Sequence, residues 1–384
     1  MANQPSVTMC RSFFYTIPAN LLYGRYWLVF LTIIIYNLFM KQFCSILKLV
    51  SVLICASTLA FASCAPKGGD LPVNKKEVMD RFVAGTLDPS YAPAAFFVHF
   101  GSDSKVGEAA VQAHLRYYLQ TNQDILKVQF EQSAPRIAEL DDERTDWMPE
   151  DFYRPTLEIC TRLQQIAGAD VYVLPTIYNP FQVARQSLGE RRIVAAAKEQ
   201  PQALKNVLDS YKAALLWLVR ECKAAGIEGF YTTTQGGEKK FYDIPGGFFE
   251  TYIKPYDLEI MGECNKGTKL NILHICDWEG PFDDLSRFAD YPGQIVNTPN
   301  SLDGTTPFSL SDGYALFKRP VLGGFDRKKE INTVSDTEVA AMAQKIFDEG
   351  PAGKVMLGAD CTVSSAPLAN LHAAVATAHR HAVK

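Results

Sequence analysis

The sequence predicts an α/β protein built as a single (β/α)8 barrel of the TIM type. Eight apolar runs are typical of buried strands, and amphipathic segments with helical periodicity separate most of them. An alternation of eight strands with helices is the number that closes a parallel barrel. A doubly wound open sheet is the structural alternative, but no Gly-x-Gly-x-x-Gly follows the first run, which disfavours a dinucleotide-binding sheet.

The elements follow one another along residues 75–384. An amphipathic helix over Lys75–Ala84 comes first and is broken at Leu87-Asp88-Pro89. The expected strands are Ala94–Phe100, Asp124–Phe130, Asp170–Ile177, Gly229–Thr233, Lys269–Cys276, Gln294–Thr298, Pro320–Phe325 and Lys354–Gly358. The expected helices are Gly107–Gln120, Ala203–Ala225, Gly247–Gly262, Thr337–Phe347 and Pro367–Ala382. Gly226, directly after one periodic run, is a typical helix stop.

One long insertion, Gln132–Glu158, separates the second and third expected strands. It is rich in charge, proline and aromatic residues, including Asp141-Asp142-Glu143-Arg144 and Trp147. An insertion of this length on a barrel is either a loop over the active site or a peripheral addition. Both interpretations stay open from the sequence.

The amino terminus differs in character from the rest of the chain. Read from Met40, residues 40–63 form a secretory signal, with Lys41 and Lys48 before an apolar stretch. The Phe61-Ala62-Ser63-Cys64 segment resembles the lipobox of bacterial lipoproteins, which implies that Cys64 is acylated and that residues 64–75 are a tether. Residues 1–39 are then an over-called leader, and the barrel occupies residues 76–384. One or two transmembrane helices are the alternative.

Composition excludes some classes of function. The net charge of −4 does not favour nucleic acid as a partner. The nine cysteines show no spacing typical of a disulfide framework. Three cysteines outside any motif are expected to be buried or incidental thiols: Cys160, Cys222 and Cys264. Three histidines on the last expected helix are expected at the surface: His372, His379 and His381.

A candidate zinc site ends the fifth strand. His274 and Cys276 are two positions apart, so their side chains project to the same side of a strand. Cys361 comes just after the eighth strand, and the carboxyl ends of barrel strands converge on one face. One imidazole and two thiolates with a fourth position open are typical of a catalytic zinc. Without the barrel, the alternative is a core histidine with satisfied hydrogen bonds and two buried thiols.

Four segments of the chain resemble the uroporphyrinogen decarboxylase superfamily of TIM-type barrels. They are Phe230-Tyr231-Thr232-Thr233-Thr234-Gln235-Gly236-Gly237, Leu273-His274-Ile275-Cys276, Val321-Leu322-Gly323-Gly324-Phe325-Asp326 and the turn from Gly358 to Pro367. The resemblance implies one of two activities. One branch decarboxylates uroporphyrinogen without a cofactor, and the other uses a His-x-Cys…Cys zinc site to methylate a thiol from a methylcobamide (corrinoid) protein.

The motifs favour the second branch. The decarboxylases carry an arginine-rich motif near the first strand, whereas Ala94-Ala95-Phe96-Phe97-Val98-His99-Phe100-Gly101 contains no arginine. His274, Cys276 and Cys361 match the zinc triad of the methyltransferases at all three positions. The resemblance therefore implies Zn²⁺ as cofactor, a corrinoid (cobalamin) as methyl donor, and a small thiol as substrate.

Other polar residues at strand ends are weaker candidates. We expect His99, Tyr178 and Gln235 to contact substrate, with backbone bonding, simple packing or a plain turn as the alternatives. Glu131 is a candidate acid/base or fourth ligand, and otherwise a solvated loop residue. Asp326 matches the Gly-x-x-Asp stretch of the superfamily and is a candidate catalytic residue, with an N-cap as the alternative.

Three functions remain open on these residues. The first is a zinc-dependent methyltransferase-like enzyme, the second a uroporphyrinogen decarboxylase, and the third a non-catalytic lipoprotein that binds a corrinoid or tetrapyrrole. An exported lipoprotein, anchored to a membrane only through its lipid on the periplasmic or cell-surface side, would be separated from cytoplasmic corrinoid proteins. The exported location predicted by the signal at residues 40–63 therefore conflicts with the cytoplasmic methyl donor that the zinc motif implies.

Overall fold

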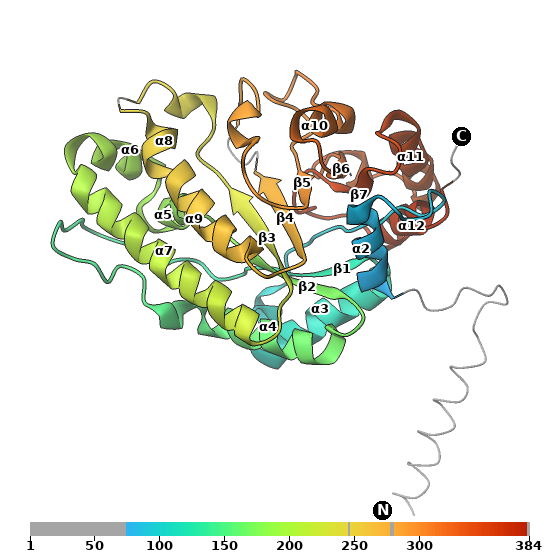
Figure 1. Cartoon of the computed structure of the whole chain (residues 1–384), viewed down its shortest axis with the longest axis horizontal. Coiled ribbons are helices and arrows are strands. Elements are labelled where there is room, and N and C mark those ends of the chain that lie inside the picture. Colours follow the sequence, from blue (N-terminus) through green and yellow to red (C-terminus); the bar gives the residue numbers. More distant parts are fainter. Residues whose placement is uncertain (1–73, 245, 277–279, 382–384) are drawn as a thin grey trace, which may run out of the picture. The chain divides into compact units, whose positions relative to one another are not determined.

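A parallel β-sheet that curls around a common axis forms the centre of the protein (Figure 1). The computed structural model describes residues 74–244, 246–276 and 280–381. Within these residues the sheet has seven strands, hydrogen-bonded in their order along the chain. The strands are β1 (Ile125–Val128), β2 (Tyr172–Ile177), β3 (Gly229–Thr234), β4 (Leu270–Ile275), β5 (Ile295–Asn297), β6 (Val321–Phe325) and β7 (Val355–Ala359).

Helices cover the outside of this sheet (Figure 1). They are α2 (Lys75–Ala84), α3 (Gly107–Thr121), α4 (Arg154–Ala167), α5 (Pro180–Leu188), α6 (Glu190–Glu199), α7 (Pro201–Ala224), α8 (Phe248–Tyr252), α9 (Lys254–Asn265), α10 (Leu310–Phe317), α11 (Asp336–Glu349) and α12 (Leu368–Ala378). Short 3-10 turns lie at Ser102–Ser104, Glu150–Tyr153, Lys239–Phe241, Ser286–Phe288 and Glu330–Asn332. Local sequence sets several of these boundaries: Ser335 and Glu338 form a capping box at the start of α11.

The predicted α/β class with a parallel sheet is confirmed, and seven of the eight expected strands lie within two or three residues of their predicted bounds. The first, Ala94–Phe100, is extended but pairs as a β-bridge only at Ala94. None of the expected helices covers α4, α5, α6 or α10, and α4 lies in part inside the expected insertion. The expected helix over Gly247–Gly262 is divided at Ile253 into α8 and α9.

The segment before α3 closes the sheet into a barrel. The backbone amide of Ala95 donates to the carbonyl of Leu357 in β7. On the other side, the backbone amide of Asp124, just before β1, donates to the carbonyl of Ala94. Gly358 permits this close approach, because a Cβ atom built on it would lie 2.6 Å from the carbonyl oxygen of Ala95. Residues 93–97 thus occupy the eighth strand position and join both edges of the seven-stranded sheet.

A buried carboxylate, Asp124, ties the first and last helices to this closure. It accepts hydrogen bonds from the ammonium of Lys75 at 2.9 Å, the hydroxyl of Tyr91 at 2.6 Å and the amide of Ala94 at 2.7 Å. His379 Nε2 lies 2.9 Å from the same carboxylate. Burial acts to raise the pKa of Asp124, but the hydrogen bonds and the charges of His379 and Lys75 hold that pKa below its usual value.

His379 therefore corrects the expectation of a surface histidine. Its ring stacks on Tyr91 with centroids 4.4 Å apart and contacts Asp124, 255 residues away along the chain. The periodicity of a terminal helix does not show which of its polar residues meets a buried charge from another element, and this contact is a tertiary one. Cys160, Cys222 and Cys264 are fully buried, as expected.

The long insertion runs along the outside of the helices. The amide of Ile137 donates to the carbonyl of Ser187 in α5, Arg192 of α6 donates to the carbonyl of Ala138, and the amide of Met148 donates to the hydroxyl of Ser210 in α7. Trp147 is buried against this layer. The structure therefore favours the peripheral interpretation of the insertion over a loop covering the active site.

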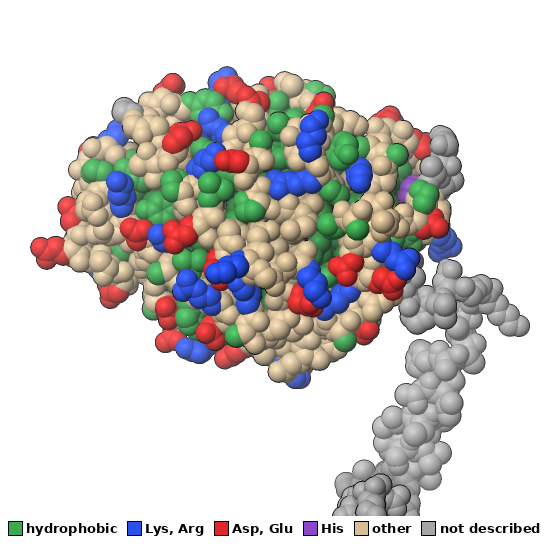
Figure 2. Space-filling view, in the orientation of Figure 1, with side chains coloured by type: hydrophobic (Ala, Val, Ile, Leu, Met, Phe, Trp, Pro, Cys, Tyr) green, Lys and Arg blue, Asp and Glu red, His purple; other side chains and the backbone are tan. Residues whose placement is uncertain are grey.

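Several sequence interpretations fall on residues that the structure does not describe. The leader at 1–39, the signal at 40–63, Cys64 and most of the tether lie outside the described residues. Among the helices that are described, none combines the length and the apolar character needed to cross a bilayer. On the face shown in Figure 2, basic and acidic side chains are interspersed rather than segregated.

Replacing Asp124 by Asn tests the closure of the barrel. At pH 7 the change should lower the free energy of unfolding by about 3–5 kcal/mol, because it leaves the ammonium of Lys75 buried without its counter-charge. Since the folded-state pKa of Asp124 is depressed, its stabilisation is present above the unfolded-state pKa of about 3.9 and is lost as the pH falls through the folded-state value. The difference between variant and wild type should therefore narrow below about pH 4.

Urea unfolding at pH 7 and at pH 3.5 measures both effects. Asp290→Asn is the matched control, because Asp290 forms an exposed ion pair with Lys254 and its loss should cost about 1 kcal/mol or less. Equal losses from the two variants at pH 7 would contradict a central role for Asp124.

Candidate metal centre

A cavity of about 600 Å³ opens at the carboxyl ends of the strands. Its walls include side chains from β1, β2, β3 and β4 and from the segments that follow β6 and β7. In (β/α)8 barrels the active site lies at the carboxyl ends of the strands, and residues at these strand ends carry out the chemistry. The cavity therefore lies where the fold predicts an active site.

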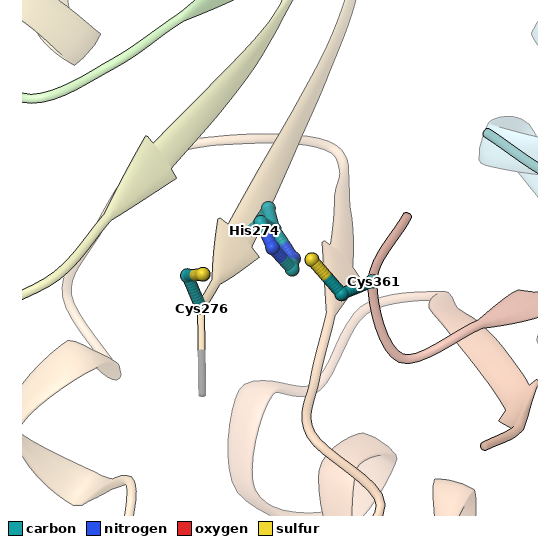
Figure 3. A group of neighbouring side chains, drawn as sticks. All are labelled: His274, Cys276 and Cys361. Atoms are coloured by element: carbon teal, nitrogen blue, oxygen red, sulfur yellow. The ribbon is translucent and has the colours of Figure 1, made fainter. Parts of the chain in front are cut away.

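His274, Cys276 and Cys361 meet in the wall of this cavity. One potential ligand atom from each residue, an imidazole nitrogen and two sulfur atoms, lies within 4.8 Å of the others. His274 and Cys276 come from β4 and the residue that follows it, and Cys361 comes from the turn after β7 (Figure 3). In Figure 3 the imidazole of His274 lies between the two cysteines, and both sulfur atoms point toward it. The structure thus brings together the three residues that the sequence pattern singled out as ligands.

The hydrogen bonding of His274 supports a metal site. His274 is 3% exposed, yet among the described residues neither Nδ1 nor Nε2 has a hydrogen-bond partner. A buried imidazole without any partner is costly, so most buried polar groups are satisfied. Coordination of a cation by one ring nitrogen would remove that cost, and an imidazole with two thiols is a suitable donor set for a soft or borderline divalent metal. The three residues fit a bound metal ion.

The electrostatics favour thiolate at this position. The pKa of Cys361 is lowered well below its usual value, chiefly by a hydrogen bond with Cys276 and also by the charges of His274 and Arg327, although burial opposes the shift. The side-chain amide of Gln235 donates to Cys276 Sγ at 3.3 Å. Thiolate is the form that binds metals and acts as a nucleophile. The surroundings of Cys361 thus stabilise its thiolate form.

Gln235 is itself held in place by an ion-pair network. Arg185 of α5 donates to Gln235 Oε1 at 2.9 Å, which directs the amide nitrogen of Gln235 toward Cys276. Glu190 accepts from the same guanidinium at 2.9 Å, and the buried Glu238 lies 3.5 Å from it. Outer partners of this kind orient metal ligands and tune their affinity.

A second ion pair fixes the turn that carries Cys361. The carboxylate of Asp360 accepts from the backbone amide of Arg327 at 2.8 Å and from the Arg327 guanidinium at 3.2 Å. Both side chains are 6% exposed. Because Asp360 precedes Cys361 and Arg327 follows β6, this pair links the sixth and seventh strands at the point where the thiol enters the cavity.

A buried lysine lies on the inner face of β1. Lys127 Nζ is 4.8 Å from the ring centroid of Phe97 and 4.7 Å from that of Tyr231, and it donates to Gln129. The ring of Tyr231 in turn stacks on His274, with centroids 5.4 Å apart. Burial lowers the pKa of Lys127 to about 8, while the charges of Cys361, Glu131 and Cys276 act to raise it.

The three predicted substrate residues all line the cavity. His99, Tyr178 and Gln235 are among its walls, and His99 is exposed enough to reach a ligand. Gln235 has the additional contact with Cys276 that the sequence did not indicate. Their role toward a substrate stays a prediction.

The two predicted catalytic carboxylates lie apart from the cavity walls. Glu131 accepts from the backbone amide of Phe100 and lies 3.0 Å from His99 Nδ1. Asp326 accepts from the backbone amide of Lys328 and pairs with Lys329. Asp326 therefore closes a local turn and does not cap a helix, because Lys329 is the N-cap of the following 3-10 turn; the residue that lines the cavity here is Arg327. Catalytic roles for Glu131 and Asp326 stay predictions.

The sequence analysis missed the charged residues that surround the ligands. Lys127 carried a usable signal, because it is the one charge inside the apolar run from Ile125 to Phe130. Arg185 and Arg327 carried none, since their partners lie 50 and 33 residues away, at Gln235 and Asp360. Such pairs are formed by the fold and cannot be inferred from spacing.

The comparisons with known proteins show the fold of this chain but not its family. No protein-family model matches the chain, and no curated protein matches it. Among solved structures, a methyltransferase from Methanosarcina mazei superposes with a TM-score of 0.62 at 14% sequence identity, covering 79% of this chain and 98% of that one. A B12-independent methionine synthase from Shewanella sp. W3-18-1, in complex with selenomethionine, gives a TM-score of 0.49 at 13% identity, with 76% and 96% covered. The first likeness shows that this chain has the same barrel fold as a known methyltransferase.

Proposed function

We propose that this protein is a zinc-dependent, methyltransferase-like enzyme of the uroporphyrinogen decarboxylase superfamily. One observation carries the proposal: His274, Cys276 and Cys361 converge within 4.8 Å in the wall of a cavity, and both nitrogens of His274 lack a hydrogen-bond partner in the part of the chain that the structure describes. Three protein ligands beside a cavity leave a position for a substrate, as catalytic zinc sites do and structural sites do not. The barrel shared with a known methyltransferase agrees with this reading.

In the proposed site, His274, Cys276 and Cys361 would hold the metal. Zinc would lower the pKa of an acceptor thiol so that the thiol is present as thiolate near neutral pH. Gln235 holds the sulfur of Cys276 by its amide, and Arg185 fixes the direction of that amide. The Asp360–Arg327 pair holds the turn that presents Cys361. These residues fix the ligand set before a substrate arrives, which reduces reorganisation during the reaction.

The cavity sets the size and position of the acceptor. At about 600 Å³ it has the volume of a pocket for a small ligand. Tyr178 and His99 line its walls and would contact the acceptor beside the metal. A corrinoid would supply the methyl group, with the acceptor sulfur gaining the bond to carbon that the donor would lose and the donor keeping the electron pair of that bond.

We propose further that the mature protein is exported and lipid-anchored through Cys64. The signal over residues 40–63 and the Ala62-Ser63-Cys64 sequence support this location. The donor would then be a corrinoid that is present outside the cytoplasm. Mass spectrometry of the natural protein should find an acylated Cys64 as the first residue, and a peptide from residues 1–39 would contradict the proposal.

Metal analysis of the purified protein tests the site directly. We expect about one zinc per chain, lost in Cys276→Ala and in Cys361→Ala because each removes one of three ligands. Gln235→Leu keeps all three ligands but removes the amide that holds Cys276, so zinc affinity should fall by about 10–100-fold. Elemental analysis and competition with a chromophoric chelator measure these quantities.

Cys264→Ala is the matched control for the thiol variants. Cys264 is a fully buried cysteine on α9, outside the ligand cluster, and its replacement should leave zinc content unchanged. A folded wild-type protein that binds no metal would overturn the zinc proposal.

Product analysis distinguishes methyl transfer from decarboxylation. With methylcobalamin as donor and a panel of small thiols, the wild-type protein should form a methyl thioether, and His274→Ala should abolish it. A decarboxylase would instead release carbon dioxide from uroporphyrinogen without metal. That outcome would refute the methyltransferase proposal, and tetrapyrrole binding without either product would favour a binding protein.

A further inference from the structure

Lys127 is an unusual residue for the interior of a barrel. It is 8% exposed, and no carboxylate of the described residues lies within ion-pair distance of its ammonium. Its contacts are one hydrogen bond to Gln129 and the faces of the Phe97 and Tyr231 rings. Aromatic faces attract a cation, but they carry no net charge. Buried lysines without a counter-charge are rare because desolvation of the ammonium is costly.

Glu131 is the carboxylate whose charge acts on the pKa of Lys127, but it is bound to other groups. Its oxygens accept a hydrogen bond from the backbone amide of Phe100 and lie close to His99. The other charges that act on Lys127 are those of Cys361 and Cys276. Lys127 also lines the same cavity as the two thiols. The ring of Tyr231 contacts both its ammonium and the imidazole of His274.

The charge of the proposed metal centre explains this placement. A divalent zinc with two thiolates and a neutral imidazole has no net charge. Entry of a third thiolate, that of the acceptor, gives the centre one net negative charge inside a cavity of low polarity, where an uncompensated charge is costly. Arg185 and Arg327 are already tied to carboxylates. Lys127 is the cation of the described cavity wall that is both buried and without a carboxylate partner.

We propose that Lys127 supplies the counter-charge for an acceptor thiolate at the metal, and thereby makes the centre select an anionic sulfur ligand over a neutral one. This inference rests on the proposed zinc site. It assigns Lys127 a charge-compensating role and requires no proton transfer by the lysine. Attraction between opposite charges inside the barrel is screened less than in water, so the effect on ligand choice is measurable.

Cobalt(II) in place of zinc makes ligand entry visible, because thiolate-to-cobalt charge transfer absorbs in the near ultraviolet. The probes are 2-mercaptoethanol, which binds as a thiolate, and imidazole, which binds as a neutral ligand. In Lys127→Met we expect 2-mercaptoethanol to bind roughly tenfold more weakly and the pH midpoint of its binding to rise by about one unit. Imidazole binding should change little, since it adds no charge.

Three further variants separate charge from packing. Lys127→Arg keeps the cation and should restore thiolate binding, whereas Lys127→Gln keeps a donor for Gln129 without the charge and should behave like Lys127→Met. Lys345→Met removes an exposed lysine of α11 that pairs with Glu349, and it should leave both ligands unaffected. Cobalt content and the far-ultraviolet circular dichroism spectrum verify that each variant is folded and loaded.

The outcomes distinguish the two proposals. A cobalt-loaded Lys127→Met protein that binds 2-mercaptoethanol with wild-type affinity and wild-type pH midpoint overturns the role of Lys127 and leaves the metal site intact. Equal weakening of 2-mercaptoethanol and imidazole also overturns it, because that pattern indicates a packing defect. A wild-type protein that takes up no cobalt or zinc overturns the proposed function and this inference together.

Discussion

The hydrogen bonds that residues 93–97 make to both edges of the sheet are the constraint on which the candidate site depends. In an open sheet, β4 and β7 would be separated by three strand spacings, at least about 14 Å. The ligand atoms of His274, Cys276 and Cys361 instead lie within 4.8 Å of one another. Only curvature and closure of the sheet can bring the ends of those two strands to one cavity. Asp124, Lys75 and His379 stabilise that closure from the opposite end of the strands.

Charged groups are buried at both ends of the barrel, but they are used differently. At the closure, Asp124 receives four donors and its charge is fully compensated by its neighbours. Around the cavity, two ion pairs hold Gln235 and the turn of Cys361, while among the described residues His274 has no hydrogen-bond partner and Lys127 no carboxylate partner. Uncompensated polar groups cost stability. Their concentration in one cavity agrees with a site that acquires a metal and an anionic ligand.

Much of the fold could be predicted from local pattern. The runs from Ile125 to Val128 and from Leu270 to Ile275 are mostly apolar and buried at every position, as strands covered by helices are. The segment Ala94–Phe100 is not a regular strand, because it forms a β-bridge only at Ala94. The backbone amide of Phe96 donates to the side-chain oxygen of Gln123 and not to a backbone carbonyl of a neighbouring strand. Helix α4 was not predicted because an irregular, charged stretch precedes it, and the short helices α5, α6 and α10 were not predicted either.

The sequence by itself determined the ligand types and the strand that carries two of them, because His274 and Cys276 repeat with the period of a strand and end an apolar run. It also indicated Cys361, but only through the assumption of a closed barrel. The tertiary structure alone decided which charged groups surround the candidate ligands: Arg185 at Gln235, Arg327 at Asp360, and Lys127 against the ring of Tyr231. Side-chain contacts between elements far apart in sequence depend on how the strands and helices pack, and no local periodicity encodes that packing.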